Sequence, residues 1–484
     1  MKSNWISFLL LFLFLFIFSA CEKDFLNTVP STSIDETQAY SSPAKILAQV
    51  NNLYAQMQNP IYYGGRMLIF NEQRADEFGQ NDGNAATGSA VWNQNVASTS
   101  EYINNLWTSA YAAINSANIL IEKLSSSSVV SDSLKKLYIG EAKFVRALCY
   151  LNLVQTYAKP FNLDSSALGV PLRLKAISSK GNNDLARSSV GDVYLQIIED
   201  LNDAEKSLPV GYTTAYLNTS RAHQSTAIAL KTRVYLNMNR FQDVVTEAAK
   251  MVSSAAPFHY INGSVSHQLE SNFANLFTGS YTGAESILSI VFANTTTETP
   301  PSQFALSFNY ITQPILFLAK EGIGHDSLMK DLSDARSNMI GLSPAKHRIL
   351  RKFAISTAPF RDYVPVIRYA EVLLNYAEAA AQIGQLSQAQ DLLKAVRKRS
   401  KPGSDFEDAE INTKEALVKT ILKERRIEFL GEGLRLQDIQ RQVLPLAKKT
   451  GSIGTAPEVL PTANNYIWPI PSDELAANKL CLPN

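Results

Sequence analysis

The first residue placed for a defined chemistry is Cys21, which directly follows a small serine and a small alanine. Small residues just before a cut are what a signal peptidase requires, and Lys2 supplies the positive charge that begins such a signal. The continuous apolar run from Phe8 to Phe18 is shorter than the roughly 20 residues of a spanning helix. We therefore expect residues 1–20 to be a signal peptide whose removal leaves the Cys21 thiol at the new N-terminus.

The four residues at 18–21, Phe-Ser-Ala-Cys, resemble a bacterial lipobox, in which the freed cysteine thiol carries a diacylglyceryl group. Phe18 stands where leucine is usual. Each buried acyl methylene contributes about 0.8 kcal/mol, so two or more chains anchor a protein stably without a spanning helix. We expect lipidation of Cys21 to hold the chain on a membrane; the alternative is an ordinary secretory signal followed by an incidental cysteine.

The charge balance argues against a nucleic-acid partner, because 45 Lys and Arg face 44 Asp and Glu. The one basic triplet, 397–399, is typical of a solvated helix end. The five histidines form no His-x-x-x-His pair and no Cys-x-x-Cys occurs, so we predict neither a metal site nor a cofactor. Cys149 and Cys481 define no disulfide framework, although a bridge between them is an open alternative in an oxidising compartment.

Charged residues gather in "ERRIEFLGEGLRLQD" (424–438), where opposite charges recur at helical spacing around apolar anchors. We interpret this stretch as a structural ion-pair corner, with a ligand site as the alternative. Gly431 and Gly433 are expected to end the helix by taking left-handed backbone angles. No Gly-x-Ser-x-Gly motif occurs, and a pair of glycosidase carboxylates need not be close in sequence, so the sequence does not exclude that chemistry.

Helical periodicity dominates the elements that would position these residues. Apolar residues spaced by three and four predict helices at 101–124, 133–158, 189–207, 222–237, 241–253, 366–383, 386–398 and 413–430. Between them lie Gly-, Asn- and Ser-rich segments, and loops of such length are usually functional. The longest are 59–100, 159–188, 254–320 and 450–470.

Two predicted helix pairs share one register. Ala377 and Ala389 stand twelve residues apart, as do Thr232 and Val244, at the positions where tetratricopeptide helices pack on one another. Apolar residues follow each pair at companion positions and would fill the seam. We predict an all-α scaffold of tetratricopeptide-like helical repeats with minor β content; a pattern that any antiparallel helix pair tolerates is the alternative.

Several motifs, taken in order, resemble the SusD/RagB family of lipid-anchored nutrient-binding proteins. They are "CEKDFLNTVPS" (21–31), "LWTSAYAAINSANILIEKL" (106–124), "EAKFVRALCYLNLVQTYAKPF" (141–161), "GVPL" (169–172), "RSSVGDVYLQIIEDLNDAEKSLP" (187–209), "DLSDAR" (331–336), "VIRYAEVLLNYAEA" (366–379), "KERRIEFLGEGLRLQDIQR" (423–441) and "YIWPIPSDELAAN" (466–478). The extreme C-terminal tail departs from the family, ending in Leu-Pro-Asn. The resemblance implies an N-terminal region, 21–265, and a C-terminal region, 266–484, that form one compact unit.

The resemblance also implies ligand contacts on two loop regions. Aromatic rings stack on the C–H faces of sugars, while amides and charged groups bind hydroxyls at the rim. In 61–95 the expected contacts are Tyr62, Tyr63, Arg66, Trp92, Asn93 and Asn95, and in 258–319 they are Tyr281, Phe308 and Tyr310. For each ring the alternative is that it packs a loop onto the scaffold. Trp107 begins a helix motif and is expected in the core.

The function implied by the resemblance is capture of an oligosaccharide or other polymer fragment at the cell surface and its delivery to a SusC-like, TonB-dependent outer-membrane transporter. The protein would be held on the outer membrane by its lipid and would not be an enzyme. Tethering makes transfer effectively intramolecular, so a weakly held ligand can still be passed on. The alternatives are a surface glycoside hydrolase, a tetratricopeptide-like adaptor that binds only protein, and a peptide-binding lipoprotein.

Overall fold

The structure is a computed structural model that describes residues 36–178, 181, 183–278, 281–292 and 299–484. The predicted signal peptide and the predicted lipidation site, Cys21, lie outside the described residues. The chain divides into two compact units, Met1–Gln49 and Val50–Asn484. In the first unit the structure describes α2 (Glu36–Ala39) and the start of α3 (Pro43–Met57). The architecture described below is that of Val50–Asn484.

Helices account for most of the regular structure in this second unit. After α3 they are α4 (Arg66–Arg74), α5 (Ser89–Trp92), α6 (Glu101–Ser125), α7 (Asp132–Tyr157), α8 (Val190–Ser207), α9 (Ala215–Ser220), α10 (Gln224–Asn237), α11 (Phe241–Ala248), α12 (Tyr369–Gln382), α13 (Leu386–Ser400), α14 (Asp408–Ile411), α15 (Lys414–Glu428), α16 (Arg435–Arg441) and α17 (Ser472–Ala477). Among the described residues, no helix is long and apolar enough to cross a membrane.

The described strands are short and pair only in antiparallel twos: β1 with β5, β2 with β3, β4 with β8, β6 with β7 and β9 with β10. Their bounds are β1 (Phe78–Gln80), β2 (Tyr260–Asn262), β3 (Val265–His267), β4 (Ser286–Ile290), β5 (Leu316–Leu318), β6 (Ile340–Leu342), β7 (Arg348–Leu350), β8 (Val364–Arg368), β9 (Lys449–Gly451) and β10 (Gly454–Ala456). The predicted fold class, helical with minor β content, is confirmed.

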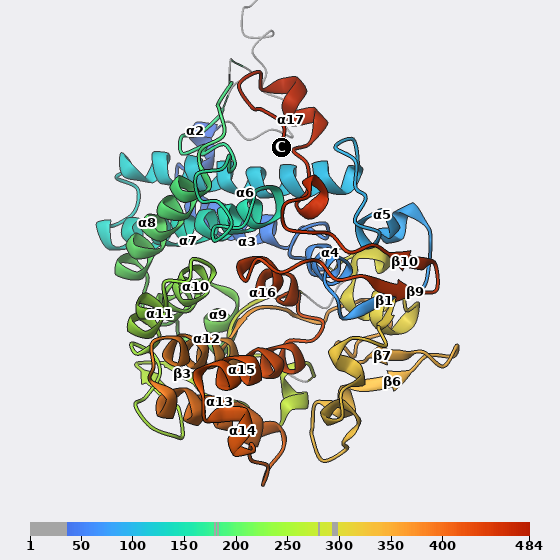
Figure 1. Cartoon of the computed structure of the whole chain (residues 1–484). Coiled ribbons are helices and arrows are strands. Elements are labelled where there is room, and N and C mark those ends of the chain that lie inside the picture. The colour runs from blue at the N-terminus through green and yellow to red at the C-terminus, as the bar shows by residue number, and fades with distance from the viewer. Residues whose placement is uncertain (1–35, 179–180, 182, 279–280, 293–298) are drawn as a thin grey trace, which may run out of the picture. The chain divides into compact units, whose positions relative to one another are not determined.

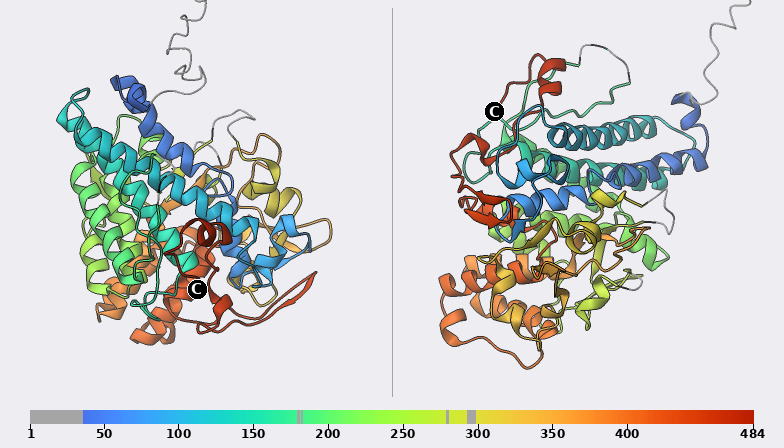
Figure 2. Two further views of the ribbon diagram at one scale, coloured as in Figure 1. Left: turned by 90° about the horizontal axis from the view of Figure 1, so that it is seen from above. Right: turned by 90° about the vertical axis from the view of Figure 1, so that its right-hand side faces the viewer.

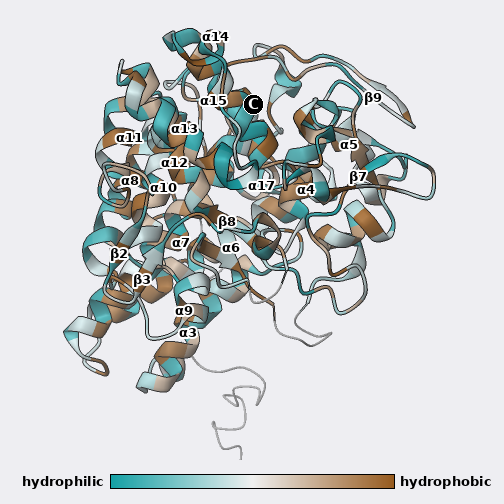
Figure 3. Ribbon diagram, turned by 90° about the horizontal axis from the view of Figure 1, so that it is seen from below, coloured by the Kyte–Doolittle hydropathy of each residue, from teal (hydrophilic) through white to brown (hydrophobic). Residues whose placement is uncertain are grey.

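The helices form a continuous stack, in which α6 packs on α7, α7 on α8, α8 on α10, α10 on α11, α11 on α12 and α12 on α13. Figure 1 shows this succession running down one side, while β1, β6, β7, β9 and β10 lie on the other, and the views in Figure 2 agree. Single helices carry both polar and apolar residues (Figure 3). On α8, for example, the buried Val193, Ile197, Leu201 and Ala204 recur every three or four residues, so one face packs inward.

The two predicted repeat pairs are helical hairpins, α10 with α11 and α12 with α13. Ala377, Ala389, Thr232 and Val244 are fully buried at the helix contacts, as the shared register predicted. The hairpins also pack on each other through a hydrogen bond of 3.1 Å from the Asn375 amide to the Thr232 hydroxyl. The residues of the shared register therefore pack the two helices of each hairpin together, and one of them, Thr232, also contacts the other hairpin.

Both hairpins turn in the same way. Asn239 and Gly384 lie seven residues after Thr232 and Ala377, and both take left-handed angles, with φ of 55° and 87°. The next N–H donates back to a carbonyl five residues earlier, Arg240 to Tyr235 at 2.9 Å and Gln385 to Ala380 at 2.8 Å. Such a left-handed residue satisfies carbonyls left open at a helix end. The repeat is thus encoded in the turn as well as in the packed faces.

The main departure from the sequence-based helices is α4, which lies inside a segment predicted to be a loop. Nearly every residue of α4 is buried, including Arg66, Glu72, Gln73 and Arg74, so the segment shows no exposed polar face. A helix surrounded on all sides loses the amphipathic period on which the prediction depends. By contrast α15 ends at Glu428, two residues before the predicted end, and Gly431 and Gly433 take the expected left-handed angles, with φ of 81° and 76°.

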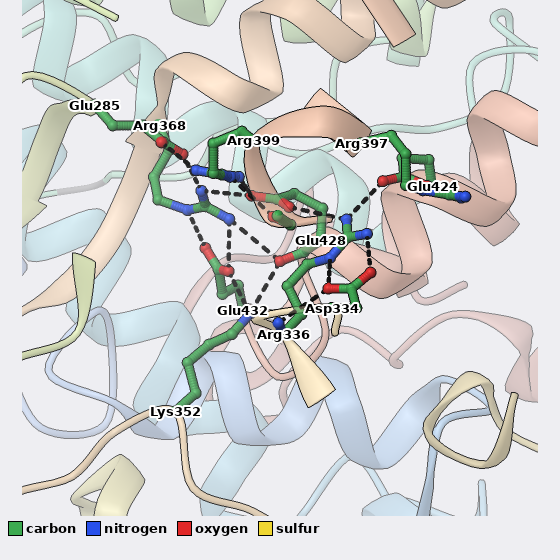
Figure 4. A network of polar contacts seen from close by, with 11 residues as sticks. Glu285, Asp334, Arg336, Lys352, Arg368, Arg397, Arg399, Glu424, Glu428 and Glu432 are labelled. Carbon is green, nitrogen blue, oxygen red and sulfur yellow. Dashed lines mark hydrogen bonds and ion pairs between the residues drawn. The ribbon is translucent and has the colours of Figure 1, made fainter. Parts of the chain in front are cut away.

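The ion-pair corner predicted from 424–438 is present and buried (Figure 4). Five acidic and five basic side chains interlock: Glu285, Asp334, Glu424, Glu428 and Glu432 with Arg336, Lys352, Arg368, Arg397 and Arg399. Arg368 reaches Glu285 at 2.5 Å, Glu428 at 3.1 Å and Glu432 at 2.8 Å. Although burial opposes it, the surrounding cations, Arg399 foremost, hold the pKa of Glu428 well below its usual range.

Candidate ligand-binding surface

The two loop regions predicted to bind ligand are brought together by a strand pair. β1 and β5 pair in register, with Phe78 opposite Leu318 and Gly79 opposite Phe317. The ladder is extended by the N–H of Asn81, which donates to the carbonyl of Ile315 at 2.8 Å. The loop that follows β1 and the loop that precedes β5 therefore start next to each other, at the same end of this two-stranded ribbon.

A buried guanidinium fixes both loops to α4. Arg66 donates to the carbonyl of Ala86 at 2.7 Å in one loop and to that of Gln303 at 3.2 Å in the other. Its guanidinium carbon lies 4.8 Å from the ring centre of Phe70 and 5.8 Å from that of Tyr102. Burial disfavours the charged form and lowers the pKa of Arg66 to about 10, so the group remains a cation at neutral pH.

A glycine permits this close approach. Gly65 has φ of 142°, and a β-carbon there would lie 2.3 Å from the carbonyl oxygen of Phe304. Any other residue would be strained and would push the second loop away. The glycine and Arg66 together set the distance between the two loops.

A third segment, the β9–β10 hairpin, lies against β1 (Figure 1). The N–H of Ser452 donates to the carbonyl of Gln80 at 2.8 Å. Lys449 is buried, donates to the carbonyls of Gln73 and Ala75, and lies 5.5 Å from the ring centre of Trp92. Burial lowers the pKa of Lys449 to about 7. The hairpin therefore packs against the first strand of the ribbon.

Trp92 does not present a ring to solvent. It is 0% exposed, and its indole N–H donates to the carbonyl of Phe78 at 2.9 Å. Gly451 makes room for it, because a β-carbon there would lie 3.0 Å from the indole. In this structure Trp92 is therefore not a stacking platform. Its position beside amides suggested a ring that faces solvent, but the ring packs the first loop onto β1.

The same correction applies to four other predicted contacts, Tyr62, Tyr63, Arg66 and Tyr310, which are all buried. Asn152 joins two of them, donating to the Tyr62 hydroxyl at 2.8 Å and accepting from the Tyr63 hydroxyl at 3.2 Å. The Tyr310 hydroxyl donates to the carbonyl of Gly431 at 3.3 Å. None offers an open face to a ligand in this structure, and each holds a loop to the scaffold instead.

Four predicted contacts do reach the surface. Asn95 is exposed, and Asn93, Phe308 and Tyr281 are half-buried. Phe308 opens a π-helical turn, 308–312, and meets Phe360 edge-on at 5.9 Å. π-Helical turns occur often at functional sites. Direct ligand contact by these four residues stays a prediction.

Tyr281 and Phe308 are linked through a segment that the sequence analysis did not single out, 353–363. The Ser307 hydroxyl, next to Phe308, donates to the carbonyl of Ile355 at 2.7 Å. Asp362 accepts from the N–H of Ile355 at 3.1 Å and from the Tyr281 hydroxyl at 3.2 Å. Tyr281 stacks on Tyr363 at 4.8 Å. Aromatic residues beside proline and a charged pair in "APFRDYVP" were the signal available in sequence.

We call the outer rim of these segments the loop surface: residues 81–97 and 302–313 with Tyr281 and Tyr363. It offers half-buried rings beside exposed amides, which suits a ligand with apolar ring faces and many hydroxyls. Tyr102, half-buried beside Arg66, is a further ring that sequence reasoning missed, because its helical spacing resembled that of a core residue.

Metal-ligating groups, thiols and carboxyl groups of raised pKa are the side chains that bear on metal or acid–base chemistry. In the part of the chain that the structure describes, no group of three or more His, Cys, Asp or Glu is arranged to hold a metal ion. Cys149 and Cys481 are both unpaired thiols. Burial raises the pKa of Glu72 to about 8, but that carboxyl is 1% exposed and out of reach of a polymer. Asp362 is the raised-pKa carboxyl that borders the loop surface.

Comparisons with known proteins define the class. Residues 24–236 match a family profile described as "Starch-binding associating with outer membrane", and residues 318–482 match one described as "SusD family". The chain therefore belongs to the SusD family. The resemblance drawn from the sequence motifs is confirmed.

Individual relatives agree over nearly the whole chain. A SusD superfamily protein from Bacteroides fragilis is 32% identical, with 91% of this chain and 99% of that chain covered and a TM-score of 0.81. A SusD-like protein from Formosa agariphila is 25% identical over 91% of both chains. A structure described as a laminarin binding SusD-like protein shares the fold at 22% identity, with 92% of this chain and 99% of that chain covered and a TM-score of 0.72.

Proposed function

We propose that this protein is a cell-surface lipoprotein that captures an oligosaccharide on its loop surface and delivers it to a SusC-like, TonB-dependent transporter of the outer membrane. The observation that carries the proposal is the joining of two loops by the β1–β5 ribbon and by Arg66. This frame holds the first loop, which carries exposed amides, next to the second loop, which carries the half-buried ring of Phe308. Binding groups on a rigid frame lose little freedom when the ligand arrives.

The lipid anchor and the transporter are separate parts of the proposal. They rest on Cys21 following two small residues and on membership of a family associated with the outer membrane. Labelled palmitate should enter the full-length chain and should fail to enter Cys21→Ser. Release of the unlabelled wild-type protein into the medium would contradict the anchor without touching glycan binding.

Glycan binding is tested by migration in native gels that contain polysaccharide. Laminarin is the first choice because a structural relative is described as binding it, followed by starch, xylan and mannan. Wild-type protein should be retarded by at least one of them, and the double change Asn95→Ala with Phe308→Ala should remove most of that retardation. Leu342→Ala is the matched control, since Leu342 is 66% exposed on β6, outside the loop surface.

The same gels separate the alternatives. A protein-only adaptor would associate with the transporter but migrate unretarded in every gel. A peptide-binding lipoprotein would be unretarded and would bind peptides instead. A hydrolase would shorten the polysaccharide, and because Asp362 has a raised pKa at the rim, loss of turnover in Asp362→Asn would identify the acid. We expect retardation, no shortened product and no effect of Asp362→Asn on product.

A further inference from the structure

A cavity of about 320 Å³ lies on α6, away from the loop surface. One face of α6 supplies Trp107, Tyr111 and Asn115, which are spaced by four residues and so stand one above another. Arg173 and Ile177 come from the loop before α8, and Glu474 comes from α17. We call this the α6 pocket. Its volume falls in the range of small-molecule sites.

The aromatic side of the pocket is held rigidly. The rings of Trp107 and Tyr111 lie 4.9 Å apart at 46°. The Tyr111 hydroxyl donates to the carbonyl of Pro171 at 2.8 Å, which fixes the ring and leaves it half-buried. Trp107, as predicted, is buried, at 3% exposed. A fixed, partly open tyrosine ring is a surface on which a sugar face can stack.

The polar side is a carboxylate whose position is set by three donors. Glu474 accepts from the Trp107 indole N–H at 3.2 Å, from Arg173 at 3.2 Å and from Asn478 at 2.7 Å. A carboxylate has about four acceptor positions, so capacity remains for a hydroxyl. Because Arg173 and Glu474 carry opposite charges, this pair adds no net charge to the pocket.

The loop that closes the pocket is anchored to α6 without any ligand. Asn115 donates to the carbonyl of Ile177 at 3.0 Å and accepts from its N–H at 2.8 Å. Asn118 donates to the carbonyl of Arg173 at 2.8 Å, as does the Tyr150 hydroxyl at 2.8 Å. Such anchoring means that little order has to be gained on binding.

The α6 pocket is separate from the loop surface. Tyr102 borders the loop surface, and Tyr111 follows nine residues later on the same helix. Nine residues advance an α-helix by about 13 Å and turn it by about half a revolution. The two sites therefore lie on opposite sides of α6.

We infer that the α6 pocket is a second carbohydrate site, which takes one neutral pyranose unit with its C–H face on Tyr111 and its hydroxyls on Glu474 and Arg173. This inference goes beyond the proposed function, because the loop surface could bind a polymer whether or not the α6 pocket is used. A polymer that reaches both sites on one molecule, or on neighbouring molecules, would gain avidity from the second.

The test uses the full-length chain in detergent, labelled with 5-fluorotryptophan, and a panel of methyl glucosides, galactosides, mannosides and xylosides. The ¹⁹F resonance of Trp107 is identified by its loss in Trp107→Phe. We expect at least one glycoside to shift that resonance saturably. Ala112→Phe fills the pocket mouth, since Ala112 lines the pocket and is exposed, and should abolish the shift.

Glu122→Phe is the matched control, because Glu122 is exposed on the same helix but outside the pocket, and it should respond as wild type does. Glu474→Gln should weaken binding by about tenfold, since a hydrogen bond to a charged acceptor is replaced by one to a neutral acceptor. A Trp107 resonance that no glycoside moves, or one that still moves in Ala112→Phe, would overturn the inference. The loss of gel retardation in Asn95→Ala with Phe308→Ala reports on the loop surface, whereas the Trp107 resonance reports on the α6 pocket, so the two failures are distinguishable.

Discussion

At the scale of single residues, burial decides what the predicted ligand contacts do. The sequence predicts Trp92 and Arg66 as ligand contacts because rings and guanidinium groups bind sugars, yet both side chains are almost wholly buried. Each instead makes hydrogen bonds to backbone carbonyls that hold a loop in place. Residue type directed the prediction to these loops, whereas the direction of each side chain depends on partners such as Gly451 and Gln303, which are distant in sequence.

Glu72 gives a prediction at this scale. One oxygen of its carboxyl accepts from the N–H of Gly433 at 2.7 Å, and the other has no hydrogen-bond partner. Burial raises its pKa from 4.5 to about 8. The folded state thus holds a proton that the unfolded state releases, so this group's contribution to stability is full below pH 4.5 and declines up to pH 8.

We expect Glu72→Gln to remove that decline, because glutamine is neutral and its oxygen can still accept from Gly433. The free energy of unfolding of the variant relative to wild type should rise by roughly 1.4 kcal/mol for each pH unit inside the window. Urea unfolding at pH 5, 6.5 and 8 measures the difference. Glu122→Gln, at an exposed position, is the control; a difference for Glu72→Gln that is constant with pH would contradict the assignment.

At the scale of elements, the helices were largely predictable and the irregular segments were not. The predicted helices 101–124 and 133–158 agree with α6 (Glu101–Ser125) and α7 (Asp132–Tyr157) within one residue at each end. Local capping fixes such ends: the Ser131 hydroxyl accepts from the N–H of Leu134 at 3.3 Å at the start of α7. The β1–β5 pairing that frames the candidate site depends on tertiary contacts between distant segments, for which no local pattern exists.

The hairpin turns give a prediction at this scale. Gly384 takes a left-handed angle, and no atom lies within 4 Å of where its β-carbon would be. Gly384→Ala should therefore destabilise by about 1 kcal/mol, purely through backbone strain. Gly384→Asn should cost less, because Asn239 occupies the equivalent position in the other hairpin. Urea midpoints with unchanged slopes measure both; equal stability of Gly384→Ala and wild type would contradict the shared turn.

At the scale of the whole Val50–Asn484 unit, the buried ion-pair network ties distant parts of the chain together. Arg368 at the end of β8 binds Glu285 beside β4, and it binds Glu428 and Glu432 at the end of α15. The sequence predicted the charges on α15 as structural but did not reveal Glu285 or Lys352, which lie next to β4 and β7, outside the charged stretch 424–438. These ion pairs hold the end of α15 against the β4–β8 strand pair.

Removing one cation should be strongly destabilising. Arg368→Met leaves three carboxylates undercompensated in a buried site, and breaking such a pair typically costs about 3–5 kcal/mol. Arg240→Met is the matched control, because the ion pair of Arg240 with Asp243 is partly exposed and should contribute at most about 1 kcal/mol. Thermal and urea unfolding compare the two. Similar losses for both variants would show that the network is not structural.

The central claim is that glycan binds at the loop surface, and hydrogen exchange tests it most directly. Amide exchange of the full-length chain should be followed with and without the polysaccharide that retards it in native gels. The account predicts slower exchange in both 81–97 and 302–313 when the polysaccharide is bound. Bound polysaccharide that leaves exchange in both segments unchanged, or protects only segments outside the loop surface, would contradict the account.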